Sequence, residues 1–301
     1  MAFIMRRPET KKPSNTSGPF KPSGTIATAL GILTLCMLSA CGGGGGGGDS
    51  SPAATGGSTT TTTPSPVTPA PTSAVNDCGE DGQVLTVPGN TAQIDANVYY
   101  TDGTTVIATQ QRRFSTSNGA SFRDKTDLFL VNQVNTTTYT NAAVNGSFGG
   151  SVMTTTENNY SKVVGDVRQT YGLTVSNLFQ GNTTTASSYF TPYAYTGAPL
   201  NPALDTAYAA NYSTTTESGG TTQPPLAQTS TTTFSSESVS VLAGTFPACK
   251  IRIEVTGGAT TANVSYTWLV AAGRYKGLVV RTANGSGVKT SEATRLVVNG
   301  Q

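Results

Sequence analysis

The sequence contains no histidine, and only 11% of its 301 residues are charged. Without histidine, the chain can form neither a Ser-His-Asp or Cys-His nucleophile nor an imidazole site for a metal. It also lacks a G-x-S-x-G nucleophile elbow, a phosphate-binding loop and a dinucleotide fingerprint. These absences predict that the protein is not an enzyme, and that it has no cofactor and no metal site.

The N-terminal 40 residues have the composition of an export signal. Five basic residues and one acidic residue fall within positions 1–24, and an apolar run follows from Thr25 to Leu38. This order of basic region, apolar region and small-residue cleavage site is typical of a secretory signal peptide. The run is too short to cross about 30 Å of hydrocarbon as a permanent helix. An ordinary signal cut elsewhere, or an uncleaved anchor, is the alternative.

The apolar run ends in Leu38-Ser39-Ala40-Cys41, which resembles the lipobox of bacterial lipoproteins. The resemblance implies that Cys41 is acylated and becomes the first residue of the mature chain. Two or three acyl chains on one residue make a lasting membrane anchor, whereas one chain binds reversibly. Gly42 follows the cysteine, and by resemblance to enterobacterial sorting this permits export to the outer membrane. The lipid membrane is therefore one expected partner, in the bacterial cell envelope.

Cleavage changes the charge of the working protein. The whole chain has 18 Lys+Arg and 16 Asp+Glu, and loss of the leader leaves 13 basic and 15 acidic residues, a net charge of −2. A weakly acidic surface argues against nucleic acid as a partner. No feature of the sequence identifies a protein partner.

Two cysteines, Cys78 and Cys249, remain in the mature chain after Cys36 and the acylated Cys41 are accounted for. An even pair in an oxidising compartment predicts a disulfide. Two free thiols or a redox-active pair are the alternatives, although the close C-x-x-C spacing typical of redox pairs is absent. The disulfide would fix the first ordered residues to a late strand.

The mature chain divides into a tether and a domain. Residues 41–77 contain seven consecutive glycines, five consecutive threonines and five prolines. Such a segment buries too little apolar surface to offset its ordering entropy, which predicts a disordered spacer. Residues 1–40 are then the signal peptide, 41–77 the lipidated cysteine and tether, and 78–301 one β-rich domain.

Alternation of apolar and polar residues predicts strands throughout residues 78–301. The clearest case is Lys250 to Thr256, and Ala262 to Val270 also alternates. Four Asp-Gly or Asn-Gly pairs, which favour tight hairpin turns, lie between such runs: Asp102-Gly103, Asn118-Gly119, Asn145-Gly146 and Asn284-Gly285. The fold class is therefore all-β, mostly an antiparallel meander. Pro202 to Ala210 is the one helix candidate, with Asn201 as its cap.

The segment Ser238 to Thr290 resembles a pattern found in uncharacterised bacterial exported proteins. The pattern comprises Val239 to Cys249, Tyr266-Thr267-Trp268 and Ala271 to Val279. These proteins are similar to the curved antiparallel sheets of lipoprotein carriers, in which a half-open barrel faces a hydrophobic ligand. The resemblance covers about a sixth of the chain, and it implies that the meander forms a curved sheet or half-open barrel that binds an apolar ligand.

Few residues are candidates for binding. Tyr266 and Trp268 are candidate ligand contacts, although core or rim packing is the alternative. Arg112-Arg113 is interpreted as a solvated or edge pair, with phosphate recognition as the alternative. Two functions therefore remain: an envelope lipoprotein that binds a lipid or other apolar ligand on a curved sheet, or a structural or surface-exposed interaction lipoprotein with no small-molecule ligand.

Overall fold

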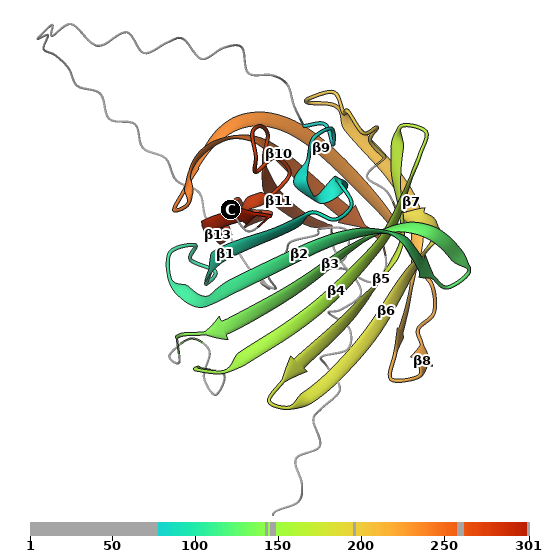
Figure 1. The fold of residues 1–301 in the computed structure, drawn as a ribbon, viewed down its shortest axis with the longest axis horizontal. Coiled ribbons are helices and arrows are strands. Elements are labelled where there is room, and N and C mark those ends of the chain that lie inside the picture. The colour runs from blue at the N-terminus through green and yellow to red at the C-terminus, as the bar shows by residue number, and fades with distance from the viewer. Residues whose placement is uncertain (1–77, 142–143, 145–148, 195–196, 258–261, 300–301) are drawn as a thin grey trace, which may run out of the picture. The chain divides into compact units, whose positions relative to one another are not determined.

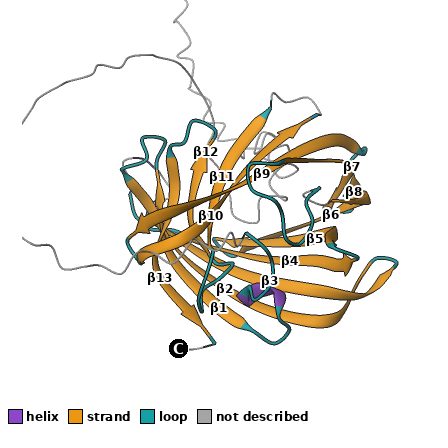
Figure 2. Ribbon diagram, turned by 90° about the horizontal axis from the view of Figure 1, so that it is seen from above, coloured by secondary structure: helices purple, strands orange, loops and turns teal. Residues whose placement is uncertain are grey.

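The computed structural model describes residues 78–141, 144, 149–194, 197–257 and 262–299. The predicted signal peptide, Cys41, the tether and the Asn145-Gly146 turn lie outside the described residues. One short 3-10 helix, η1, precedes thirteen strands (Figure 2). Within the described ranges, no helix is long and apolar enough to span a membrane. The elements are η1 (Val84–Thr86), β1 (Thr91–Tyr99), β2 (Val106–Phe122), β3 (Lys125–Tyr139), β4 (Val152–Val164), β5 (Val167–Phe179), β6 (Asn182–Ala194), β7 (Ala207–Ser218), β8 (Thr221–Thr222), β9 (Leu226–Val241), β10 (Gly244–Thr256), β11 (Asn263–Val270), β12 (Val279–Asn284) and β13 (Lys289–Val298).

The strands form one antiparallel sheet that closes on itself. The order is β6-β5-β4-β3-β2-β1-β13-β12-β11-β10-β9-β7-β8, and β6 also pairs with β7. This last pairing, from Ala186↔Ser218 to Thr191↔Ser213, closes a barrel of twelve strands, with β8 as an extra strand on β7. The prediction of an all-β, mostly antiparallel meander is confirmed. Closure goes beyond the predicted half-open sheet, because it depends on the pairing of β6 with β7 and of β1 with β13.

Strand β10 shows why the alternating pattern folds in this way. Its Ile253 and Val255 are buried, whereas Lys250, Arg252 and Glu254 are only half-buried. Successive side chains of a strand point to opposite faces of the sheet. The apolar positions therefore pack on one face, and the charged positions lie on the other, where Arg252 Nη2 and Glu254 Oε2 form an ion pair of 2.8 Å.

Two of the predicted turns join neighbouring strands. Asp102-Gly103 lies between β1 and β2, and the Asp102 carboxylate accepts the backbone N–H groups of Thr104 and Thr105 at 2.8 Å each. Asn284-Gly285 lies between β12 and β13. Asn118-Gly119 is not a hairpin turn: it lies within β2 at a shift of register, between Ser117 and Ala120.

The true turn of the β2–β3 hairpin comes later, at residues 123–124, and it lies against other strands. Phe122 stacks on Tyr160 of β4 with ring centroids 4.6 Å apart. The guanidinium of Arg123 lies 3.8 Å from the Tyr189 ring centroid and forms an ion pair of 2.9 Å with Glu217 of β7. The hairpin tip therefore crosses the sheet as far as β7, as its curved end shows in Figure 1.

The helix predicted from Pro202 to Ala210 is wrong. Strand β7 begins at Ala207, and residues 202–206 form a loop. Beyond the proline, Tyr208, Ala210 and Tyr212 alternate with the exposed residues 207, 209 and 211. A period of two places these side chains on one face of a strand, and this tertiary packing outweighs the capping signal at Asn201.

The segment Cys78–Asn90 identifies the inner face of the barrel. Thr116 Oγ1 of β2 donates to the Val87 carbonyl at 2.6 Å. Glu80 forms an ion pair of 2.7 Å with Arg168 of β5, and Cys78 is bonded to Cys249 of β10. Since β2–β5 and β9–β11 form opposite walls (Figure 2), a segment that contacts both must lie inside. We call it the floor segment, because it lies where β1 begins and β2 ends.

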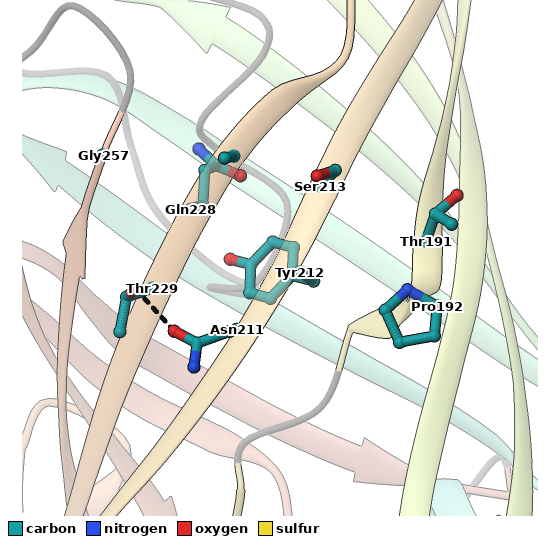
Figure 3. Close-up of a pocket in the computed structure, with 9 residues that line it drawn as sticks. Thr191, Pro192, Asn211, Tyr212, Ser213, Gln228, Thr229 and Gly257 are labelled. Atoms are coloured by element: carbon teal, nitrogen blue, oxygen red, sulfur yellow. Dashed lines mark hydrogen bonds between the residues drawn. The ribbon is translucent and has the colours of Figure 1, made fainter.

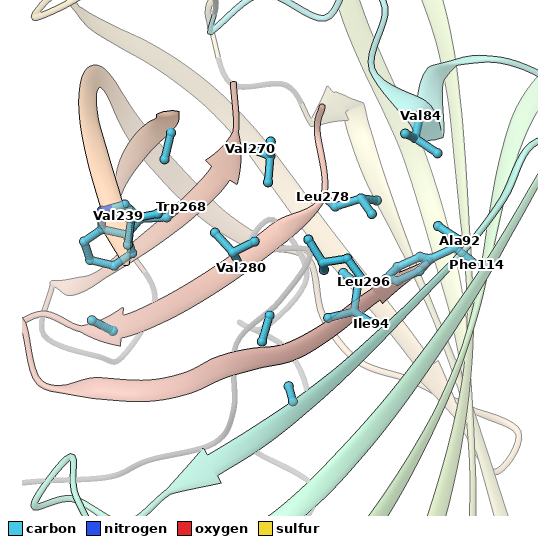
Figure 4. Close-up of a cluster of buried hydrophobic side chains, with 14 residues drawn as sticks. Val84, Ala92, Ile94, Phe114, Val239, Trp268, Val270, Leu278, Val280 and Leu296 are labelled. Carbon is cyan, nitrogen blue, oxygen red and sulfur yellow. The ribbon is translucent and has the colours of Figure 1, made fainter. Parts of the chain in front are cut away.

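Apolar side chains gather around the floor segment at this end of the barrel. Val84 joins a cluster of buried side chains from β1, β2, β9, β10, β11, β12 and β13 (Figure 4). Ile94 and Leu278 are 1% and 0% exposed. A second cluster contains Cys78, Ala198, Phe234 and Cys249. The floor end is thus packed as an apolar core.

Candidate functional site

The structure contains the Cys78–Cys249 disulfide that the cysteine spacing predicts. The two Cα atoms are 5.2 Å apart, and both residues are buried. The bond joins the floor segment to β10 across 171 residues of sequence. It therefore ties the start of the domain to a late strand, as expected. The third sequence-predicted site, Cys41, lies outside the described residues.

The two predicted ligand contacts, Tyr266 and Trp268, point to the face of β11 opposite the one shared with Cys249, and Trp268 belongs to the same buried cluster as Val84 (Figure 4). Trp268 pairs with Lys250 of β10, the neighbour of the inward-facing Cys249. The rings of Tyr266 and Trp268 are 6.2 Å apart. Tyr266 is half-buried, whereas Trp268 is only 6% exposed.

Charged groups of the protein surround these rings. Lys250 Nζ lies 5.2 Å from the Trp268 ring and 5.3 Å from the Tyr266 ring, within range of a cation–π interaction. The Arg281 guanidinium lies 5.4 Å from the Trp268 ring. The indole N–H of Trp268 donates to the Glu237 carboxylate. The rings therefore already have partners within the protein.

A shallow depression lies near the point where β7 changes partner from β6 to β9. Its volume is about 520 Å³ (Figure 3). Asn211 and Thr229 line it and share a hydrogen bond of 2.7 Å. No charged side chain lines it, so it has no charged group with which to bind a ligand. The lining residues are Thr191, Pro192, Asn211, Tyr212, Ser213, Ala227, Gln228, Thr229 and Gly257.

The inner face of β2–β5, beyond the apolar floor, is polar. Thr116 of β2 contacts the floor segment and therefore points inward. Residues paired directly across neighbouring strands point to the same side of the sheet, so the pairings of β2 with β3, β3 with β4 and β4 with β5 identify the other inward-pointing residues. Most of these side chains are half-buried, so the face is not sealed in a packed core. The polar inner-face residues are Gln110, Arg112, Gln133, Asn135, Thr137, Thr155, Glu157, Asn159 and Asn177.

Arg112 is the main charged group of this face. It is 4% exposed, whereas its neighbour Arg113 is exposed on the outer face. Arg112 donates from Nε and Nη2 to Gln110 Oε1, at 3.0 and 2.7 Å, and from Nη2 to Ser291 Oγ of β13 at 3.4 Å. Gln110 in turn donates to Thr137 Oγ1 at 3.2 Å. These bonds fix the orientation of the guanidinium, which corrects the interpretation of Arg112-Arg113 as a solvated pair.

The charge of Arg112 has no counter-charge in the described part of the chain. No ion pair there includes Arg112, and its hydrogen-bond acceptors are neutral. Burial lowers the pKa of the guanidinium to about 10, so the group stays charged at neutral pH. A buried charge without a partner is costly, and an anion at this position would offset that cost.

Glu157 is the inner-face carboxylate of β4, two strands away from Arg112. It pairs with Gln133 of β3 and Val175 of β5. Burial raises the pKa of its carboxyl to about 7, because the uncharged form is favoured away from water. Glu157 is therefore only partly ionised near neutral pH. The carboxylates of Asp95, Glu237 and Glu254 lie on the outer face.

Four buried polar atoms on the inner face have no hydrogen-bond partner among the described residues: Asn135 Oδ1, Asn159 Oδ1, Ser230 Oγ and Thr232 Oγ1. Two lie on β3 and β4, and two lie on β9 in the opposite wall. Buried polar atoms in native proteins are almost always hydrogen-bonded to protein or to water. These atoms therefore mark places for water or a polar ligand. In the described ranges, no group of three or more Asp, Glu, Cys or His residues could hold a metal ion.

Apart from Arg112, which it named with Arg113 as an alternative site of phosphate recognition, sequence reasoning did not identify the inner-face residues. In the stretch from Gln110 to Thr116, every second residue is Gln, Arg, Phe or Thr, and the residues between them are equally polar. Because both faces of β2 are polar, alternation could not show which arginine points inward. Only the contact of Thr116 with the floor segment settles it.

No protein-family model and no curated protein matches this chain. A solved structure from Bacteroides fragilis, described as a "putative exported protein with YmcC-like fold", is similar over 70% of this chain and 96% of its own. The identity is 12% and the TM-score is 0.32. A likeness this distant carries no conclusion about function.

Proposed function

We propose that this protein is a lipid-anchored protein of the bacterial cell envelope whose barrel binds a polar small molecule against its inner face. The observation that carries the proposal is the inner face of β2–β5. That face is polar and half-exposed, and it holds the buried Arg112 and two amide oxygens without partners.

The anchor and the compartment rest on the sequence. Leu38 to Cys41 resembles a lipobox, and a glycine- and proline-rich tether follows. The Cys78–Cys249 disulfide agrees with an oxidising compartment outside the cytoplasm. Incorporation of labelled palmitate tests the anchor: we expect it in the full chain and not in Cys41→Ser. Equal labelling of both would overturn this part of the proposal.

The polar face favours a polar ligand over the acyl chain that the carrier resemblance implies. An acyl chain against Asn135, Asn159 and Arg112 would exclude water and leave their polar atoms unpaired. Each such atom costs about 1–3 kcal/mol, and a charged group costs more. A ligand with hydroxyl, amide or charged groups can supply the missing partners instead.

A matched pair of substitutions on β4 tests the site. Thr155 lies on the inner face, opposite Asn135, and Thr156 lies on the outer face, opposite Val134. The full chain in detergent is mixed in turn with monosaccharides, amino acids, dipeptides and inorganic phosphate, and thermal unfolding is measured. We expect at least one solute to stabilise the wild type and Thr156→Trp, but not Thr155→Trp, whose indole fills the site.

Two outcomes would overturn the proposal. One is that no solute raises the unfolding temperature of the wild type. The other is that Thr155→Trp responds as the wild type does, which would place binding away from the inner face. The shallow depression beside Tyr212, where β7 changes partner from β6 to β9, would then be the next place to search.

A further inference from the structure

We infer that the ligand of the inner face carries an anionic group, a carboxylate or a phosphate, and that Arg112 binds this group. The inference rests on the proposed function and narrows its ligand class. It begins from a chemical imbalance: the polar inner face contains a permanent buried cation, and the charge that would neutralise it is missing among the described residues.

The cation is held in place rather than free to move. The Arg112 guanidinium bonds to Gln110 on its own strand and to Ser291 on β13. Ser291 also shares a hydrogen bond of 2.7 Å with Thr282, which shares one of 2.8 Å with Thr290. Arg112, Ser291 and Thr282 are all at most 4% exposed. A fixed guanidinium loses little side-chain entropy when it binds a ligand, which favours recognition.

These contacts leave donor capacity on Arg112. A guanidinium has five N–H donors, and Gln110 and Ser291 accept three bonds from Nε and Nη2. Nη1 has no hydrogen bond to any described residue. A carboxylate or phosphate is the group that a guanidinium binds most strongly, because the bonds are charge-assisted and can form in pairs.

The protein's own carboxylates do not fill this role. Arg123, Arg168 and Arg252 each form an ion pair with a glutamate at 2.7–2.9 Å. Arg112 is more buried than these three, and yet it has only the neutral Gln110 and Ser291 as partners. The carboxylate on the same face, Glu157, is two strands away and offset along the strand, and among the described residues it forms no hydrogen bond or ion pair with Arg112. An incoming anion is therefore the missing counter-charge.

The test uses three variants of the full chain, with inorganic phosphate and acetate as probes in a chloride buffer of matched ionic strength. Arg112→Gln removes the cation. Arg113→Gln removes the neighbouring cation on the outer face and serves as the matched control. Gln110→Glu supplies an internal carboxylate beside Arg112 with almost no change of shape, so it competes with the ligand without removing the arginine.

Binding is measured by calorimetry and by the shift in unfolding temperature. We expect saturable binding of at least one probe to the wild type. Arg112→Gln and Gln110→Glu should each weaken it at least about tenfold, which corresponds to about 1.4 kcal/mol. Arg113→Gln should change it less than about twofold. If Arg112→Gln fails to fold, Gln110→Glu still decides, because we expect it to fold and to unfold at a higher temperature than the wild type without ligand.

Failure of the inference is distinguishable from failure of the proposed function. Absence of saturable anion binding in the wild type, or equal weakening by Arg112→Gln and Arg113→Gln, would overturn the inference. If an uncharged solute then stabilised the wild type but not Thr155→Trp, the inner face would still be a polar binding site. Arg112 would then only join β2 to β13 through its hydrogen bond with Ser291.

Discussion

Arg112 of β2 and Ser291 of β13 lie 179 residues apart in the sequence and share a hydrogen bond of 3.4 Å inside the barrel. The bond reaches over β1, which separates the two strands in the sheet. It can span this distance because Ala96, which lies between Ile94 and Val98 on the inner face of β1, is small. The orientation of Arg112 thus depends on closure of the sheet through the pairing of β1 with β13.

The pH dependence of stability tests the environment of Glu157. The pKa of its carboxyl in the folded protein, about 7, lies above its ordinary value of 4.5. The folded state therefore binds the proton more tightly than the unfolded state. The free energy of unfolding consequently falls as the pH rises from 4.5 through 7. We expect Glu157→Gln to match the wild type below pH 4.5 and to be more stable above pH 7, by roughly 2–3 kcal/mol.

Urea unfolding at a series of pH values measures this difference. The control is Glu254→Gln, on the outer face, where Glu254 is paired with Arg252. This variant controls for the loss of a carboxylate that has a basic partner. A constant difference for Glu157→Gln across the same range would show that the carboxyl is not buried as described.

The disulfide should stabilise the domain by fixing the floor segment to β10. The closed loop is 171 residues long, for which the chain-entropy model gives roughly 5 kcal/mol as an upper value. We expect Cys78→Ser combined with Cys249→Ser to lower the free energy of unfolding by about 2–5 kcal/mol, measured in urea. Wild-type protein treated with a reductant should behave like the double variant. If oxidised and reduced wild type unfolded at the same urea concentration, the bond would not be formed.

Gly172 of β5 tests the position of the β2–β3 hairpin. A Cβ at this residue would lie 2.2 Å from Phe122 Cε1 and 2.5 Å from the Ser188 carbonyl oxygen. The phenyl ring could move, but the carbonyl is part of a paired strand. We expect Gly172→Ala to cost about 1–3 kcal/mol in thermal unfolding. Gly285→Ala, where the nearest atom is 3.1 Å away, should cost less. Equal effects would contradict the close approach of Phe122 and the Ser188 carbonyl to Gly172.

Trp268 offers a test of the sequence-based binding hypothesis, because it is the only tryptophan. It is buried in the apolar cluster that contains Val84, and it contacts Glu237 and Lys250. We expect its emission maximum to stay constant when phosphate or acetate binds to the inner face. A shift on addition of phospholipid vesicles to the full chain would instead indicate that Tyr266 and Trp268 contact an apolar ligand, as the carrier resemblance implies.

The local parts of this fold could be predicted from the sequence. Alternation between Lys250 and Thr256 predicts a strand with one apolar face, and β10 has that face. The Asn284-Gly285 turn between two strands also follows from residue type, since Asn284 Oδ1 accepts the N–H groups of Ser286 and Val288. Only two cysteines remain in the predicted mature chain once Cys41 is acylated, which predicts that Cys78 pairs with Cys249. The structure contains this disulfide.

The non-local parts could not be predicted. Asn118-Gly119 has the residue types of a tight turn, but the chain continues through it as β2 because the hairpin tip packs on Tyr160 and Tyr189. Closure through β6 and β7 joins strands with a long loop between them, and no local pattern signals it. The inward direction of Arg112 follows only from that closure and from the floor segment, so the candidate site was invisible to alternation.

The most direct measurement follows the side chain of Arg112 itself. In the full chain, the Nε–Hε resonances of Arg112 and Arg113 can be observed by NMR during a titration with inorganic phosphate at constant ionic strength, with Arg112→Gln and Arg113→Gln used for assignment. Arg112 should show a saturable shift, because its guanidinium gains a charged partner, and Arg113 should stay nearly constant. A shift of Arg113 alone, equal shifts of both, or no shift of either would contradict anion binding by Arg112 on the inner face.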